Sequence, residues 1–97
     1  MTHDPRTIQD RDGVAVVIYE KPECSQCTLS KKRLDEAGVV YGRVDITEDP
    51  YAFLFVKNLG YMAAPVLYVS TPEEDLHWYG FRPDLIAKHI TGREDAA

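Results

Sequence analysis

Residues 14–27 read VAVVIYEKPECSQC, and this stretch decides the fold. Its first six residues form a continuous apolar, β-branched run, which is typical of a strand buried on both faces of a parallel sheet. The chain breaks at Pro22 and resumes at Ser25 with residues that favour a helix, which we expect to end at Gly38. Cys24 and Cys27 therefore lie at a junction between a strand and a helix.

The rest of the chain continues to alternate between strands and helices. We predict strands over 39–46, 66–69 and 76–79, and helices over about 50–60 and 83–91. Residues 47–50, TEDP, supply a capping residue, acids for the first helical turn and an early proline. The order β-α-β-α-β-β-α predicts an α/β protein. One right-handed parallel crossover is followed by an antiparallel hairpin, which gives a four-stranded mixed sheet flanked by three helices.

Apolar residues at three- and four-residue steps give each helix a face toward the sheet. In the first helix, the residues near helical spacing are Leu29, Arg33, Leu34 and Ala37. The expected inward residues are Tyr51, Leu54, Phe55 and Leu59 in the second helix, and Leu85, Ile86, His89 and Ile90 in the third.

Length and charge narrow the possible functions. The 97 residues, 44% apolar, suit a single domain over 1–97, with a polar tail over 1–12 and a frayed end over 93–97. A net charge of −5 disfavours nucleic acid as a partner, and we expect a solvated helix face at the basic run 31–33 rather than a docking patch. No leader or membrane span is apparent, so we expect a cytoplasmic protein with no membrane partner. A single close pair of cysteines fits that reducing compartment. We also expect a monomer.

The two cysteines carry the expected chemistry. Cys24 lies where the unpaired N–H groups of a helix point, so we expect its thiol pKa to be lowered and Cys24 to be the nucleophile. Cys27, one turn later, then resolves the mixed disulfide. Lys21 and Lys31 add positive potential, and Glu23 opposes it. A disulfide closing so short a loop adds little stability, which favours a redox role.

A metal site is the rival interpretation of a C-x-x-C pair. Structural zinc needs four ligands, and His3, His77 and His89 do not complete a set with the cysteines, so we expect no metal within one chain. A zinc ion or iron–sulfur cluster shared by two chains stays an alternative. We assign His3 to the tail and His89 to packing at the third helix, and leave His77 open.

Pro65 opens the predicted strand over 66–69 after two alanines. A lone proline there is commonly a strand edge. The alternative is a cis bond between Ala64 and Pro65, beside the cysteine turn, that presents backbone groups to an extended substrate segment.

Three segments make the sequence recognisable. They are YEKPECSQC (19–27), LGYMAAPV (59–66) and HWYGFRPD (77–84), and together they resemble the NrdH-redoxins, a glutaredoxin-like family, over about residues 14–91. The resemblance implies a thioredoxin/glutaredoxin fold and a thiol-disulfide oxidoreductase with no bound cofactor beyond a redox-active Cys24–Cys27 disulfide. It implies electrons from NADPH through thioredoxin reductase, passed to class Ib ribonucleotide reductase.

By the same resemblance Pro65 is cis, and residues 78 and 80–83 form the loop into the last helix. We place substrate and partner binding at Ser25, Gln26, Tyr61, Met62, Ala64, Pro65, Trp78, Gly80, Phe81, Arg82 and Pro83. Core packing is an equal alternative for Trp78 and Phe81, and pairing with a surface acid is one for Arg82.

The sequence departs from the NrdH pattern at one place and from thioredoxin at another, and two other functions stay open. Tyr79 stands where the family commonly has serine, and residues 14–19 lack the buried acid of thioredoxin, so the proton of Cys27 must go to solvent or to another group. A glutathione-dependent glutaredoxin is the first alternative function, although the double glycine of its anion site is missing at 80–81. A redox-sensing or metal-sharing binding protein is the second.

Overall fold

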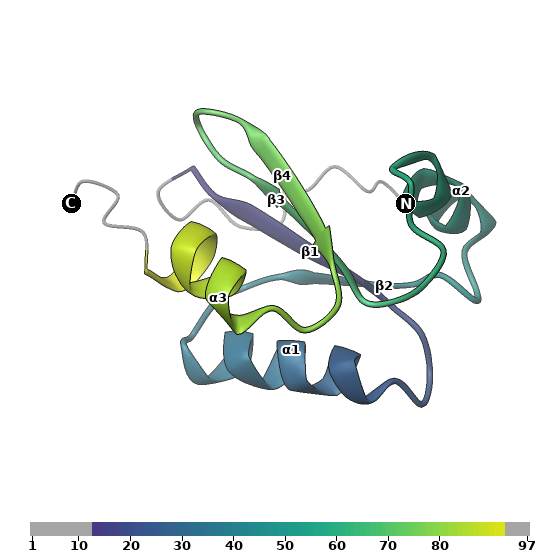
Figure 1. Ribbon diagram of the computed structural model, residues 1–97, viewed down its shortest axis with the longest axis horizontal. Coiled ribbons are helices and arrows are strands. Elements are labelled where there is room, and N and C mark those ends of the chain that lie inside the picture. Colours follow the sequence, from purple (N-terminus) through teal and green to yellow (C-terminus); the bar gives the residue numbers. More distant parts are fainter. Residues whose placement is uncertain (1–12, 93–97) are drawn as a thin grey trace.

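The computed structural model describes residues 13–92, which form one sheet with helices on both faces (Figure 1). The tail predicted over 1–12 and the frayed end predicted over 93–97 lie outside the described residues. No helix among residues 13–92 has the length and apolar character needed to cross a bilayer.

The sheet has four strands in the order β2-β1-β3-β4. They are β1 (Ala15–Glu20), β2 (Gly42–Asp45), β3 (Val66–Ser70) and β4 (Asp75–Tyr79). β1 pairs parallel with β2 and antiparallel with β3, and β3 pairs antiparallel with β4. The predicted mixed sheet and terminal hairpin are confirmed. β2 is shorter than the predicted 39–46, because its pairing with β1 begins only at Gly42 and ends where β1 ends.

The helices form two layers around this sheet. α1 (Ser25–Glu36) and α3 (Pro83–Ile86) cover one face, and α2 (Pro50–Asn58) lies at the other (Figure 1). The side chains of β1 alternate between the layers: Val16 and Ile18 pack with α1 and α3, whereas Val17 and Tyr19 pack with α2. β1 is therefore buried on both faces, as its apolar run predicts.

The inner faces of the first two helices differ from the prediction. In α2, Tyr51 and Leu54 are 79% and 51% exposed, and Ala52 and Val56 are buried instead. In α1, Leu29 is exposed, and the buried residues are Cys27, Ser30 and Leu34. The prediction is nevertheless confirmed in part, because Leu34 is buried in the core and Phe55 and Leu59 are half-buried against it. Arg33 and Ala37 are exposed. The buried positions also include the small or polar residues Ser30 and Ala52, which a pattern of large apolar residues does not indicate.

The ends of the helices follow local chemistry. The Asp49 carboxylate caps α2 by accepting hydrogen bonds from the N–H groups of Tyr51 and Ala52, with Pro50 in the first turn. The predicted acids of the first turn are absent from α2, because Glu48 lies in the preceding turn and Asp49 serves as the cap. α3 continues as a π-helical segment, η2 (Ala87–Thr91).

Ile86 of α3 and Ile90 of η2 are buried in the core, and Leu85 and His89 are half-buried. The inner face predicted for the last helix is therefore confirmed, although its second half is not α-helical.

Candidate active site

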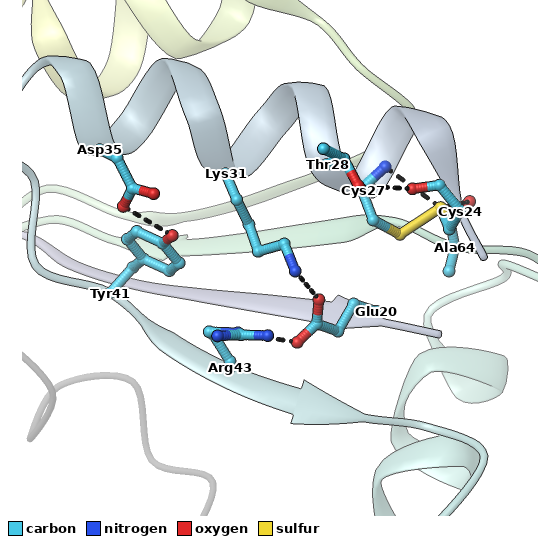
Figure 2. A network of polar contacts seen from close by, with 9 residues as sticks. All are labelled: Glu20, Cys24, Cys27, Thr28, Lys31, Asp35, Tyr41, Arg43 and Ala64. Atoms are coloured by element: carbon cyan, nitrogen blue, oxygen red, sulfur yellow. Dashed lines mark hydrogen bonds and ion pairs between the residues drawn. A yellow bond between two sulfur atoms is a disulfide. The ribbon is translucent and has the colours of Figure 1, made fainter. Parts of the chain in front are cut away.

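The two cysteines lie at the end of β1, where the chain turns into α1 (Figure 2). Glu23 adopts a positive φ of 56°, and this tight turn brings Cys24 to the N-cap position of the helix. Cys24 is half-buried, whereas Cys27 is 1% exposed. The two residues form a disulfide. The accessible sulfur of the pair is therefore that of Cys24.

The N-terminal end of α1 places positive potential at the sulfur of Cys24. The N–H of Cys27 donates a hydrogen bond to Cys24 Sγ at 3.1 Å, and the N–H of Thr28 donates to the Cys24 carbonyl at 3.1 Å. Unpaired N–H groups and the helix dipole favour a thiolate over a thiol at this place. The geometry therefore suits Cys24 as the attacking sulfur and Cys27 as the buried resolving sulfur.

The segment before β3 reaches the same place. Ala64 and Pro65 are both buried, and the peptide bond between them is cis. The carbonyl oxygen of Ala64 lies 3.8 Å from Cys24 Sγ (Figure 2). The prediction that this loop returns beside the cysteine turn with a cis proline is confirmed. The carbonyl of Pro65 already accepts a hydrogen bond from Gly80 N–H at 2.8 Å.

Gln26, between the cysteines, holds the segment after β4. Its side-chain oxygen accepts a hydrogen bond from Phe81 N–H at 2.9 Å. Gly80 has a φ of +90°, and a Cβ placed there would lie 3.1 Å from the same Gln26 oxygen. A hydrogen bond between one backbone N–H and the Gln26 side chain therefore holds the segment 78–83 against the dithiol loop. No pattern in the sequence indicates this bond, since its partners are far apart in the chain.

The side chains of this segment divide into buried and exposed ones. Trp78 is 5% exposed and belongs to the core between the sheet and the helices α1 and α3, so its burial favours core packing over a contact surface. Phe81 is half-buried against the same core, with the Arg33 guanidinium 5.8 Å from its ring centre. Arg82 is exposed and pairs with Asp84 at 2.9 Å, which matches the expected surface ion pair.

The remaining candidate residues surround the disulfide less tightly. Ser25 is exposed in the first turn of α1, and Pro83 is a half-buried residue at the start of α3. Met62 is 76% exposed. Tyr61 is half-buried, and its hydroxyl lies 2.9 Å from His77 Nδ1 on β4. Of the two binding residues expected just before the cis-proline loop, Tyr61 and Met62, the exposed one is Met62. The hydroxyl of Tyr61 contacts His77, the histidine that the sequence left open.

A cluster of charged side chains near the dithiol is not predicted from the sequence. Glu20, the last residue of β1, is buried and binds Lys31 of α1 and Arg43 of β2 (Figure 2). The positive charge that the sequence predicts near the cysteines at Lys31 is paired with this carboxylate. The signal in the sequence is weak, because an acid that follows a strand usually indicates the start of an exposed turn.

Comparisons with known proteins agree with this geometry. The family described as Glutaredoxin matches residues 16–71. The Glutaredoxin-like protein NrdH of Lactococcus lactis subsp. cremoris is 36% identical over 75% of this chain and 96% of that relative. The Escherichia coli protein of the same name is 30% identical over 73% of this chain and 83% of its own length.

The chain belongs to the NrdH-redoxins of the glutaredoxin family.

A solved structure supports this membership of the NrdH-redoxins. The NrdH-redoxin from Escherichia coli, described as a glutaredoxin-like protein with a thioredoxin-like activity profile, has a TM-score of 0.66 and 29% identity, over 75% of this chain and 91% of that chain. The chain described here, as a member of the same family, therefore has a thioredoxin-like fold. It is a thiol-disulfide oxidoreductase that works through Cys24 and Cys27.

Proposed function

We propose that this NrdH-redoxin takes electrons from NADPH through thioredoxin reductase and delivers them to a disulfide of the class Ib ribonucleotide reductase large subunit, in the cytoplasm. The Cys24–Cys27 pair is the redox group, and the reaction needs no bound cofactor. The family membership supports this assignment, and the Escherichia coli relative has a thioredoxin-like activity profile.

The observation that carries the choice of donor is the hydrogen bond between Phe81 N–H and Gln26. Free backbone N–H groups beside the dithiol would form an anion site for a carboxylate of glutathione. Here the side-chain oxygen of Gln26 already accepts from Phe81 N–H at 2.9 Å, and the Arg82 guanidinium is paired with Asp84. A protein donor contacts a wider surface and does not need a free N–H group at Phe81.

The reaction then proceeds in two exchanges. Thioredoxin reductase supplies two electrons, and the Cys24–Cys27 disulfide takes up two protons to become a dithiol. The Cys24 thiolate attacks one sulfur of the acceptor disulfide, so that a mixed disulfide forms and one acceptor sulfur leaves as a thiolate. Cys27 loses its proton and attacks Cys24 Sγ, so that the mixed disulfide breaks, the second acceptor sulfur leaves as a thiolate and the Cys24–Cys27 bond is restored. The two protons of the dithiol end on the two acceptor sulfurs.

A coupled assay tests the proposal directly. NADPH consumption is measured with thioredoxin reductase, this protein and class Ib ribonucleotide reductase as the final acceptor. A parallel reaction replaces the donor with glutathione and its reductase. We expect fast turnover only in the first reaction. Turnover in the glutathione arm at an equal rate would identify a glutathione-dependent glutaredoxin instead.

Cysteine variants separate the two chemical roles. We expect Cys27→Ser to accumulate the mixed disulfide with the acceptor, because Cys24 still attacks and nothing resolves it. Cys24→Ser should form none. If Cys24→Ser trapped the acceptor instead, the assignment of the nucleophile would be reversed.

A further inference from the structure

Glu20 is the one charged side chain that is buried among residues 13–92, and the exchange steps above do not use it. Lys31 Nζ lies 2.5 Å from one of its carboxylate oxygens, and Arg43 Nε lies 2.9 Å from the other. The carboxylate thus joins β1, α1 and β2. The two cationic partners offset part of the desolvation cost of this buried carboxylate.

This cluster lies beside the dithiol. Lys31 follows Cys27 by four residues in α1, so the two side chains leave the same face of the helix about one turn apart. Figure 2 shows both side chains on the same side of α1, with Glu20 beneath them. The side chains of Glu20 and Lys31 are 11% and 21% exposed, so solvent screens these two charges less than it screens a fully exposed charge. The side chain of Arg43 is 59% exposed, so its charge is screened more.

The other charged groups near the cysteines act more weakly. Lys21 and Glu23 are exposed in the turn between β1 and α1. Arg82, which precedes α3, is exposed and paired with Asp84. The segment 61–65 before β3 carries no charged side chain. Water and salt screen the exposed groups, so buried Glu20 and half-buried Lys31 supply the main fixed charge near the dithiol.

We propose that Glu20 is a positioning residue that sets the reduction potential of the dithiol by neutralising and holding Lys31. Positive charge near the sulfurs stabilises a thiolate and hence the reduced form, which makes a dithiol protein a stronger oxidant. The carboxylate of Glu20 cancels part of this charge and keeps the protein a better reductant. The proposal concerns the dithiol itself, whichever proteins donate and accept the electrons.

Equilibration with dithiothreitol tests the proposal without any protein partner. Dithiothreitol gives two electrons and two protons to the Cys24–Cys27 disulfide and becomes a cyclic disulfide. We expect Glu20→Gln to shift this equilibrium toward the reduced protein by about three- to tenfold, where tenfold corresponds to about 30 mV. Lys31→Met should shift it in the opposite direction. The double variant, which restores the net charge of the cluster, should lie near the wild type.

Asp35→Asn provides the matched control. Asp35 is an acid on the same helix, about 12 Å along the axis from Cys27, and its carboxylate accepts a hydrogen bond from Tyr41. Its substitution also removes one negative charge from the chain. We expect its equilibrium to stay within about twofold of the wild type, because this distance exceeds a Debye length at about 0.1 M salt.

The pH profile of alkylation gives a second readout. Iodoacetamide reacts with the thiolate of the reduced protein, so Glu20→Gln should move the midpoint of the profile to lower pH and Lys31→Met to higher pH. A purely structural role would lower stability without moving the two variants in opposite directions. Unchanged equilibria, or shifts in the same direction in both variants, would overturn the proposal. If Glu20→Gln does not fold, the direction of the Lys31→Met shift decides alone.

Discussion

The side-chain oxygen of Gln26 accepts a hydrogen bond from the backbone N–H of Phe81 at 2.9 Å, although 55 positions separate the two residues. A second bond, from Gly80 N–H to the Pro65 carbonyl at 2.8 Å, ties the same segment to the cis-proline loop. Three segments far apart in the sequence therefore form one frame around the disulfide. The frame is made of backbone groups and one amide side chain, so single substitutions can test it.

Gln26→Ala removes the acceptor for Phe81 N–H. We expect a loss of about 1 kcal/mol in the free energy of unfolding, measured by urea denaturation, since this is the usual net value of one hydrogen bond. We also expect faster reduction by glutathione, because the freed N–H becomes available to a carboxylate. Gln26→Glu keeps an acceptor oxygen and should retain most of the stability. An unchanged glutathione rate in Gln26→Ala would show that this bond does not exclude glutathione.

Gly80→Ala places a methyl group in the same contact. Gly80 has a φ of +90°, and its Cβ would lie 3.1 Å from Gln26 Oε1. Gly60 is the matched control, since it has a φ of +104° and nothing within 4 Å of a Cβ. Both variants pay for a left-handed backbone, about 1–3 kcal/mol, but only Gly80→Ala also crowds Gln26.

We therefore expect Gly80→Ala to slow reduction by thioredoxin reductase and Gly60→Ala to leave the rate near that of the wild type. The measurement is the initial rate of NADPH oxidation at 25 °C, with folding checked by circular dichroism. Equal rates in the two variants would mean that the crowding of Gln26 has no effect on the reaction.

The sequence predicts the fold well because its strongest signals are local. The apolar run over 14–19, the glycine after the first helix and the proline at the start of the second each act within a few residues. The predicted order of strands and helices is therefore confirmed. The position of the disulfide at the strand–helix junction follows from the same signals.

The sequence does not predict the contacts that join distant elements. The cluster of Glu20 with Lys31 and Arg43 depends on how β1, α1 and β2 meet, and the bond from Phe81 to Gln26 depends on where β4 ends. The burial of Trp78 likewise depends on the register of β4 against β3. Such pairings follow from tertiary packing, which overrides local preference.

Met62 tests the expected contact surface for thioredoxin reductase. It is 76% exposed and lies three residues before the cis-proline, so it is free to contact a protein partner. We expect Met62→Ser to raise the KM for this protein in the reductase assay by about three- to tenfold, which corresponds to about 0.7–1.4 kcal/mol of lost binding free energy. Reduction by dithiothreitol should keep its normal rate.

Val40→Ser is the matched control for Met62→Ser. Val40 is 57% exposed and lies between α1 and β2, beyond the C-terminal end of α1 and away from the cysteines at its start. This variant also removes exposed apolar surface, and we expect it to leave the KM unchanged. A rise in KM for both variants would indicate a general effect of lost apolar surface, and a rise for neither would remove Met62 from the contact surface.

Ionisation of Tyr41 lowers the free energy of unfolding at high pH. Burial, together with the hydrogen bond to Asp35, raises the pKa of Tyr41 to about 12, whereas an unfolded tyrosine titrates near 10. The folded state therefore holds this proton more tightly, so its contribution to stability is complete below about pH 10 and is lost as the pH rises through about 12. Burial also raises the pKa of Tyr19 to about 12, which adds a loss in the same direction.

Urea denaturation at pH 9 and pH 11 tests this effect. The free energy of unfolding should fall less in Tyr41→Phe than in the wild type, because the variant lacks the Tyr41 contribution and keeps that of Tyr19. An equally steep fall in both proteins would mean that Tyr41 ionises alike in the folded and unfolded states.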